Sequence, residues 1–450
     1  MYLRPAAARP ANPAGRLLRV RLIDCRGLTD YQAVMPRARF DLDQAMAAVQ
    51  PICRDVKTDG EAGLRRWSAE FDQVVPASFR VDPDWSADCW RQLDPGLASA
   101  MALAVDRRRR VAEAEVIPDN TIQLDQGAAV TIRSVPIERV GVYVPGGIAP
   151  LASSVIMNVV AAQVAGVRSI ALVSPPQAAY GGQPHPTIAG LAHHLGVDEV
   201  YAVGGAQAIA MLAYGVPGLC PRVDLITGPG NIYVVAAKRL VRGVVGIDTE
   251  AGPTEIAILA DATAPARLVA ADLLSQAEHD RQAAAVLISH DAELMAAVDE
   301  ELTRQLADLP TADRAAAALA GEQSAMVLVA DLAQAIDVAN QYGAEHLEIM
   351  TADPASVASR IRQAGAIFLG PNSPVSLGDY AAGSTHVLPT GAACHYSSGL
   401  TVRSFLKTVH VVDYSPAGLA AIAGPIERFA LAEDLPAHAR AIAVRTDDAA

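Results

Sequence analysis

Residues 199–231 read EVYAVGGAQAIAMLAYGVPGLCPRVDLITGPGN, and they decide the fold class. Two short apolar runs, residues 199–203 and 223–227, each end in a glycine turn, Gly204-Gly205 and Gly228-Pro229-Gly230. Short, wholly apolar strands of this kind are typical of a parallel sheet that helices cover on both faces. Turns that directly follow such strands lie at the carboxyl edge of the sheet, where open parallel sheets carry their ligand sites.

The alternation of apolar strands with turns and helices continues on both sides of this stretch. Further strand-like runs are predicted at residues 169–174, 255–260, 284–289, 325–329 and 366–369. Between most strands lie segments with helical periodicity, among them residues 153–165, 186–195 and 265–277. Strands that alternate with helices in this way predict an α/β fold built from mostly parallel sheet.

The flanking regions have other patterns. Residues 1–40, in which proline and arginine are scattered, are predicted to form an arm rather than part of a core. From Asp41 to about residue 115 the periodicity is helical, and residues 121–140 have strand character. The tail from His386 is mixed, and a helix is predicted near its end, at residues 436–444.

Composition and charge limit the classes of function. A chain of 450 residues, 51% of them hydrophobic, can bury the cores of two or three domains. The net charge of −13, from 36 basic and 49 acidic residues, repels nucleic-acid phosphates, so no nucleic-acid partner is expected. The longest apolar stretch, residues 155–167, is too short to cross a bilayer, so no membrane partner is expected either. Five scattered cysteines favour a reducing compartment, and a cytoplasmic protein is expected.

Two pairs of polar residues are candidates for a metal site and for proton transfer. Gln276 and His279 are three residues apart and share a face, where an amide oxygen and an imidazole can bind a divalent cation such as zinc. Glu345 and His346 are adjacent and can act as two separate proton acceptors. Each pair also has a structural interpretation, as the cap of a helix end or as a polar turn between helix and strand.

Two further motifs are ambiguous in the same way. Asp379 follows Gly378 and can bind a metal directly or orient an imidazole, but an aspartate in a glycine turn commonly forms an Asx-turn. Near the C-terminus, Pro436 suits the first turn of a helix, and His438 behind it has the alternative of being a plain surface residue.

Three glycine-rich turns are candidates for a cofactor site. They span residues 143–147, 204–207 and 228–231, and helix N-termini after such turns can hold phosphate through backbone N–H groups. Tight structural turns explain the same residues, and the usual dinucleotide motif G-x-G-x-x-G is absent after a strand. Periodicity and spacing alone therefore predict a ligand-binding α/β protein and leave its ligand open.

The segments that contain these motifs follow one another, between about residue 20 and residue 445, in the order found in one known family. They are VGVYVPGG at 140–147, VGGAQAIA at 203–210, TGPGN at 227–231, AGPTE at 251–255, LSQAEH at 274–279, AEHL at 344–347, GDY at 378–380, HVLPT at 386–390 and EDLPAH at 433–438. Together they resemble the histidinol dehydrogenase family. The resemblance implies a zinc-dependent, NAD-linked enzyme that oxidises L-histidinol through L-histidinal to L-histidine.

By this resemblance, two subunits hold the metal and the substrate together. Zinc is bound by Gln276, His279 and Asp379 of one subunit and by His438 of the partner subunit, in a homodimer with shared active sites. The same four residues also belong to the substrate pocket. The rest of the pocket is formed by Thr254, Glu345, His346, His386 and Glu433, the last of them contributed by the partner subunit together with His438.

The resemblance also assigns the proton transfers and the cofactor contacts. His346 is the general base that takes the alcohol proton while hydride leaves for NAD, and Glu345 activates the water that attacks the aldehyde. Tyr143, Gln207 and Asn231 are expected to contact NAD.

The expected fold is α/β, with two Rossmann-like doubly wound domains of mostly parallel sheet plus small N- and C-terminal dimerisation segments. After the arm of residues 1–40, residues 41–140 and 256–385 are assigned to a discontinuous large domain that carries the zinc and catalytic residues. Residues 141–255 are assigned to a Rossmann-like NAD-side domain, and residues 386–450 to a C-terminal segment that reaches the partner subunit.

Three other functions are alternatives. A related zinc- and NAD-dependent dehydrogenase of another small alcohol, such as a sulfonated diol, would share the machinery and differ in the pocket, where Thr254 and Glu433 favour an amino alcohol. A zinc hydrolase would use His, Asp and Glu residues but would not need the three turns expected to contact NAD. A non-catalytic small-molecule sensor on an α/β scaffold would tolerate the loss of His346.

Overall fold

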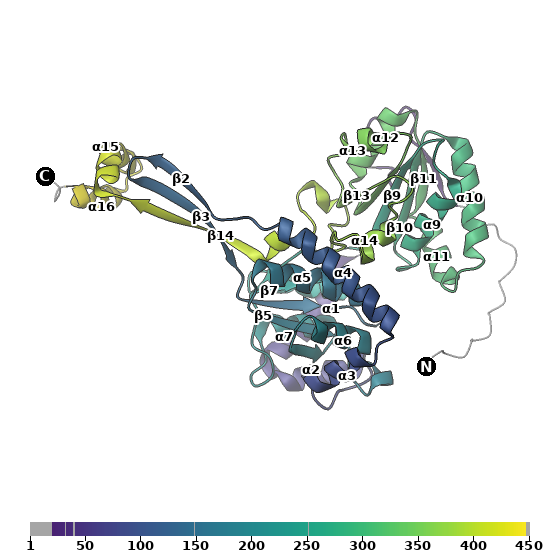
Figure 1. Cartoon of the computed structure of the whole chain (residues 1–450), viewed down its shortest axis with the longest axis horizontal. Helices are drawn as coiled ribbons and strands as arrows, with labels where there is room; N and C mark the ends of the chain where they lie inside the picture. The colour runs from purple at the N-terminus through teal and green to yellow at the C-terminus, as the bar shows by residue number, and fades with distance from the viewer. Residues whose placement is uncertain (1–19, 32, 39–40, 148, 251, 447–450) are drawn as a thin grey trace.

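The computed structural model describes residues 20–31, 33–38, 41–147, 149–250 and 252–446. They form two α/β lobes and an elongated arm that projects away from both lobes (Figure 1). The first lobe contains a five-stranded sheet, the second lobe a six-stranded sheet and the arm a three-stranded sheet. The two lobes confirm the predicted α/β fold class with mostly parallel sheet.

The first lobe contains the strands predicted at residues 199–203 and 223–227. Its strands are β4 (Arg139–Tyr143), β5 (Ser169–Ser174), β6 (Glu199–Ala202), β7 (Leu225–Thr227) and β8 (Gly246–Ile247). All neighbours are parallel, in the order β6-β5-β4-β7-β8. Its later helices are α5 (Ala152–Ala165), α6 (Pro186–His194), α7 (Gly205–Tyr214) and α8 (Ile232–Val241), with a 3₁₀ turn η1 (Ala178–Tyr180). Val142 and Tyr143 face two different apolar clusters, as a sheet covered on both faces requires.

Four helices that precede this sheet also pack on the first lobe: α1 (Leu42–Asp59), α2 (Glu61–Phe71), α3 (Pro83–Arg91) and α4 (Pro95–Ala114). α1 packs against α7 and α8, α3 against α6, and α4 against α5. The predicted grouping of residues 41–140 with residues 256–385 therefore disagrees with the helix packing. Helical periodicity reveals that a helix has a buried face, but it does not reveal which sheet covers that face.

The second lobe has the parallel strand order β1-β11-β10-β9-β12-β13. The strands are β1 (Leu22–Asp24), β9 (Glu255–Ala260), β10 (Ala284–Ser289), β11 (Ala325–Leu328), β12 (His346–Met350) and β13 (Ala366–Leu369). The helices are α9 (Ala266–Ala277), α10 (Ala292–Leu306), α11 (Ala312–Leu319), α12 (Leu332–Tyr342), α13 (Pro354–Ala358) and α14 (Val375–Tyr380). Two 3₁₀ turns follow, η2 (Ala393–His395) and η3 (Val402–Phe405).

Two strands of the second lobe differ from the sequence-based expectation. β1 lies within the predicted arm of residues 1–40 but forms an edge of this sheet, and residues 1–19 lie outside the described part of the chain. β12 begins at His346, where a polar turn was the structural alternative. A strand of three residues is too short to show a period, and charged residues interrupt the apolar character of β12.

The arm consists of β2 (Asn120–Asp125), β3 (Ala128–Pro136) and β14 (Leu406–Tyr414), followed by α15 (Pro416–Ala432) and α16 (Pro436–Thr446). β3 pairs antiparallel with both of the other strands. The arm exposes apolar side chains, including Val412, Phe429 and Leu431. The predicted strand character near residues 121–140 and the predicted helix near the C-terminus are confirmed.

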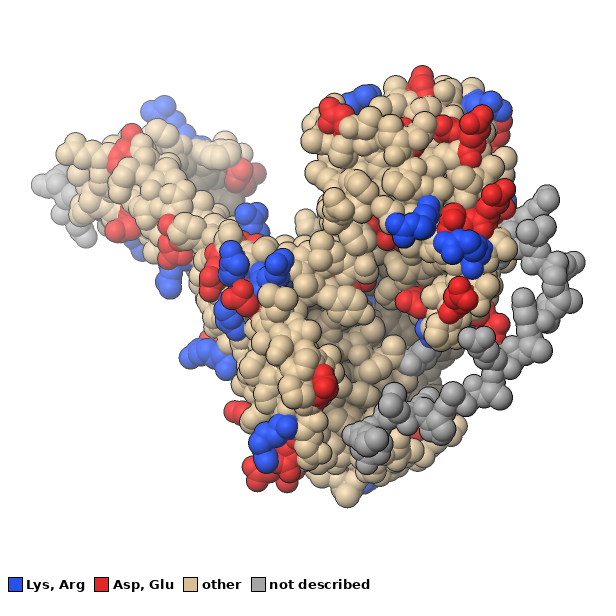
Figure 2. Space-filling model, turned by 45° about the vertical axis from the view of Figure 1, so that its right-hand side comes forward, with Lys and Arg blue, Asp and Glu red and all other residues tan. Residues whose placement is uncertain are grey.

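The surface carries mixed charge on the face that Figure 2 shows, where Lys and Arg side chains lie among Asp and Glu side chains. Within the described ranges, no helix has both the length and the apolar character needed to cross a bilayer.

Candidate active site

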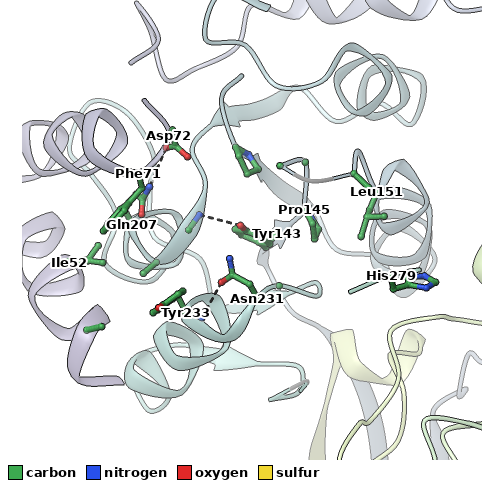
Figure 3. A pocket seen from close by; sticks show the side chains of 18 of the residues that line it. Ile52, Phe71, Asp72, Tyr143, Pro145, Leu151, Gln207, Asn231, Tyr233 and His279 are labelled. Atoms are coloured by element: carbon green, nitrogen blue, oxygen red, sulfur yellow. Dashed lines mark hydrogen bonds between the residues drawn. The ribbon is translucent and has the colours of Figure 1, made fainter. Parts of the chain in front are cut away.

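The turns at one edge of the first sheet line a cavity that second-lobe residues such as His279 also line. The turns after β4, β6 and β7 lie at the carboxyl edge of the first sheet, whereas Glu255 and His346 begin strands at the amino edge of the second sheet. A cavity of about 810 Å³ is lined by residues of both lobes, among them Tyr143 from the first lobe and His279 from the second (Figure 3). The expectation of a ligand site at carboxyl strand ends therefore describes the first lobe only.

The three residues predicted to contact NAD all line this cavity. The Tyr143 hydroxyl accepts a hydrogen bond of 3.2 Å from the Gly205 backbone N–H, next to Gln207 on α7. The Asn231 side-chain oxygen caps α8 by accepting from two backbone N–H groups at 3.0 and 3.2 Å. The structure thus brings together Tyr143, Gln207 and Asn231 from three separate turns.

Gly228 allows these turns to come close to one another. Its φ of +110° lies in the region that favours glycine, and a Cβ there would be 2.0 Å from the Tyr143 carbonyl oxygen. A side chain at this position would push the turn after β7 away from the end of β4. The close approach of the turns after these two strands therefore depends on Gly228.

Glu345 is buried at the amino end of β12. Its Oε2 accepts hydrogen bonds from the Thr254 hydroxyl at 2.6 Å and from the Glu255 backbone N–H at 2.9 Å. Burial, opposed by these two hydrogen bonds, raises the pKa of Glu345 to about 7. The carboxyl group can therefore both hold and release a proton near neutral pH.

His346 is also buried, and its tautomer follows from its contacts. Nδ1 lies 3.2 Å from the Glu255 carbonyl oxygen, which can only accept, so Nδ1 carries the proton and Nε2 keeps its lone pair. Burial lowers the pKa of His346 and favours the neutral imidazole. The ring is therefore held ready to accept a proton at Nε2.

Two predicted residues, His279 and His386, lie beside the carboxylate of a third, Asp379. His279 Nε2 lies 3.9 Å from Asp379 Oδ2, and His386 Nδ1 lies 3.9 Å from Asp379 Oδ1. His279 Nδ1 is 3.0 Å from the Ser275 carbonyl oxygen, so its Nε2 faces Asp379 as a second acceptor. His386 donates through Nδ1 to the Asp379 carbonyl oxygen at 3.1 Å, and its Nε2 lies 3.3 Å from the Ser154 hydroxyl.

Gln276 is linked to Glu345 through the Thr254 hydroxyl. Its Nε2 donates to the Thr254 hydroxyl oxygen at 2.5 Å, and the same hydroxyl donates to Glu345. Its Oε1 is buried and has no hydrogen-bond partner. An amide oxygen, a carboxylate and an imidazole lone pair together form a donor set that suits a divalent cation. Within the described ranges, no three His, Cys, Asp or Glu side chains are grouped as a metal site by themselves.

The structure does not bring Glu433 and His438 to these residues within one chain. Glu433 caps α15 and His438 lies on α16, both at the far end of the arm, whereas α9 and α14 lie in the second lobe (Figure 1). The remaining predicted residues of the site lie in or between the two lobes.

Glu255 is a site residue that the sequence patterns do not single out. Its backbone contacts both Glu345 and His346, and its buried side chain pairs with Arg37 at 3.1 Å and accepts from the Gly391 N–H at 3.1 Å. The available signal is a carboxylate within the apolar strand EIAILA, because charged residues are seldom fully buried unless they are paired.

Glu348 and Asp272 form a buried pair of two carboxyl groups. Burial, together with the neighbouring Asp272 carboxyl, raises the pKa of Glu348 well above its usual range, so the pair holds a proton at neutral pH. Glu348 also accepts from the Val375 N–H at 2.6 Å, at the start of α14. The pair thus ties together α9, β12 and α14, which carry Gln276, His346 and Asp379.

The sequence model of the histidinol dehydrogenase family matches residues 35–446. The chain belongs to the histidinol dehydrogenase family. A histidinol dehydrogenase of Cutibacterium acnes is 58% identical over 436 residues, which cover 95% of this chain and 99% of that protein. One from Mycobacterium tuberculosis is 53% identical over 430 residues, 93% of this chain and 96% of that protein.

A solved structure of the family agrees with the fold. The crystal structure of histidinol dehydrogenase from Elizabethkingia anophelis has a TM-score of 0.91 and 32% sequence identity, and the match covers 95% of this chain and 98% of that one. The whole described architecture, including the two lobes and the arm, is therefore that of the histidinol dehydrogenase family.

Proposed function

We propose that this chain oxidises L-histidinol through L-histidinal to L-histidine, with NAD as the hydride acceptor and one zinc ion per subunit. The observation that carries the proposal is the placement of the buried Glu345–His346 pair beside Gln276, His279 and Asp379, with a long cavity leading away from His279. Membership of the histidinol dehydrogenase family supports the choice of substrate.

Gln276, His279 and Asp379 are the residues of this chain that would hold zinc. They fit because the Gln276 amide oxygen has no donor and because His279 Nε2 and Asp379 Oδ2 face each other as two acceptors. Zinc bound there would supply a Lewis acid that positions the substrate through its nitrogen groups. His438 of the partner subunit would complete the site, and Glu433 of the partner subunit would contact the substrate.

The cavity lined by residues of both lobes is the proposed NAD site. Tyr143, Gln207 and Asn231 line it, and α7 and α8 begin beside it, so the positive ends of both helix dipoles lie next to the proposed site of the phosphates. NAD accepts a hydride in each of the two oxidations. The protein would align the nicotinamide with the substrate.

His346 would remove the proton from the substrate alcohol. Its Nδ1–H is held by the Glu255 carbonyl oxygen, which leaves the Nε2 lone pair for the alcohol proton. Because burial lowers the pKa of His346, the imidazole is neutral before the step and returns its proton readily after it.

Glu345 would act in the aldehyde step. Its Oε2 is engaged by Thr254 and by the Glu255 N–H, so Oε1 is the oxygen that takes a proton from the attacking water. The protonated His346 left by the first step would return its proton to the aldehyde oxygen as water attacks, which completes a neutral aldehyde hydrate. His346 is then free to remove a proton from this hydrate as the second hydride leaves. Thr254 and His386 would hold the pocket in shape through their hydrogen bonds.

A homodimer and a cytoplasmic location complete the proposal. The exposed apolar side chains of the arm are suited to a second copy of the chain, which would bring His438 of the partner subunit to the site. All five cysteines are free, which suits a reducing compartment.

The test is the stoichiometry of NADH formation with purified protein. L-Histidinol and excess NAD should yield two NADH per L-histidine, measured by absorbance and by amino-acid analysis, and a chelator should stop the reaction until zinc is added back. No NADH from histidinol in a protein shown to contain zinc would contradict the proposal. NADH formation from a sulfonated diol but not from histidinol would favour the related-dehydrogenase alternative.

A further inference from the structure

One end of the cavity has a carboxylate that the proposed mechanism does not use. Asp72 caps the C-terminus of α2, lines the cavity, and accepts a hydrogen bond of 3.4 Å from Gln207 Nε2. Figure 3 shows Asp72, Phe71 and Gln207 together at one end, His279 at the opposite end, and Tyr143 and Asn231 between them.

The chemistry of the site sets the direction of a dinucleotide in this cavity. The nicotinamide has to reach the substrate beside His279 and His346, because hydride transfer requires contact between the reacting atoms. The adenosine half must then occupy the end that contains Asp72. Phe71 and Ile52 at that end offer apolar walls to the adenine ring.

Asp72 has the properties of a ribose acceptor. Burial raises the pKa of Asp72 to about 6, so the group is still mainly ionised at neutral pH. An ionised carboxylate only accepts hydrogen bonds, and ribose hydroxyls are donors that it can bind. Dinucleotide-binding folds commonly use an acidic residue on the adenosine ribose in this way.

Among the described residues, no positively charged side chain lines the Asp72 end of the cavity. Of the described residues that line the cavity as a whole, Arg314 and His279 are the only ones able to carry positive charge, and both belong to the second lobe. A phosphate on the ribose 2′ oxygen would therefore face the Asp72 carboxylate without a compensating charge.

We propose that Asp72 makes the site selective for NAD over NADP, by accepting hydrogen bonds from the unphosphorylated adenosine ribose and repelling a 2′-phosphate. The inference rests on the proposed use of NAD. It assigns to Asp72 a specificity-determining contact with the cofactor, while Gln207 holds the carboxylate in place.

The test is equilibrium binding of NAD and NADP to the zinc-loaded protein, measured by titration calorimetry without substrate. The variants are Asp72→Asn and Asp72→Ser, and the matched control is Glu70→Gln, an exposed acidic residue of α2 outside the cavity lining. The wild-type protein and the control should bind NAD about 100-fold more tightly than NADP, the size expected for loss of a charge-assisted contact and gain of a repulsion. Both Asp72 variants should bind NAD about tenfold less tightly and NADP more tightly than the wild type.

The possible results separate this inference from the function on which it rests. Equal affinity of the wild-type protein for NAD and NADP would overturn the inference and leave the proposed function standing. An unchanged NAD-to-NADP ratio in both Asp72 variants, with folding verified by circular dichroism, would overturn it too. If the wild-type protein bound neither dinucleotide, the proposed use of NAD itself would fail.

Discussion

Glu345 and His346 are neighbours in sequence, and burial acts on them in opposite directions. It raises the pKa of Glu345 to about 7 and lowers the pKa of His346, because a charged group loses solvation in both cases. A carboxyl group with a pKa of about 7 thus lies next to an imidazole that burial keeps neutral. Their different hydrogen bonds, to Thr254 and to the Glu255 carbonyl oxygen, separate their roles.

Replacing His346 tests the base for the alcohol step. His346→Ala and His346→Asn should slow NADH formation from histidinol by about 10²- to 10⁴-fold, the usual contribution of a positioned general base. Zinc content should stay at the wild-type level, because His346 is outside the proposed ligand set. Stopped-flow absorbance and metal analysis measure both quantities, and normal turnover in either variant would refute the assignment.

Replacing Glu345 tests the water-activating step and its pH dependence. The carboxylate is the form that accepts a proton, so wild-type oxidation of histidinal should rise as pH increases through about 7 and then level off. Glu345→Gln should remove this rise and slow histidinal oxidation much more than histidinol oxidation. Rates measured separately with the two substrates between pH 5 and pH 9 decide the matter, and equal slowing of both steps would count against the role.

A buried ion pair holds the turn between β7 and α8. Lys238 Nζ contacts Asp248 and donates to the Gly228 carbonyl oxygen at 2.9 Å, and Asp248 Oδ2 accepts from the Gly228 N–H at 2.8 Å. The side chains of Lys238 and Asp248 are only 3% and 2% exposed. The pair therefore supports the glycine turn that borders the proposed cofactor site.

Asp248→Asn should destabilise the protein by about 3–5 kcal/mol, because it leaves the buried Lys238 ammonium without an opposite charge. The matched control is Glu138→Gln, which breaks the exposed pair with Arg168, whose side chain is 76% exposed, and should cost less than about 1 kcal/mol. Urea unfolding followed by circular dichroism measures both. Similar small losses for the two variants would show that the buried pair does not hold the turn.

Helices and strands with a strong local pattern can be predicted from the sequence. The elements against which they pack cannot, because those contacts join distant parts of the chain. The apolar run of residues 255–260 coincides with β9 and is evident in the sequence. β12 lies between β9 and β13 in the same sheet, but its polar first residue, His346, does not suggest a strand. The buried face of α1 was evident, but the sheet that covers it is a long-range property. Glu345 and His346 were predicted from one motif, while Glu255, which orients both, was missed because it looked like part of an apolar strand.

The arm carries two of the predicted site residues, far from the two lobes that hold the others. Glu433 and His438 lie at its far end, and exposed apolar residues such as Val412 and Phe429 make the arm suited to burial against another surface. A two-fold dimer in which each arm reaches the other subunit would supply both residues to the opposite site.

A site shared between two subunits can be tested by complementation between two inactive variants. His438→Ala and His346→Ala subunits are mixed in equal amounts, and exchange is verified by mass spectrometry of the native dimers. If His438 acts in the partner's site, each heterodimer has one intact site, and the mixture should recover about a quarter of wild-type NADH formation after random exchange. No recovery despite verified heterodimers would show that His438 does not act across the dimer and would contradict this account.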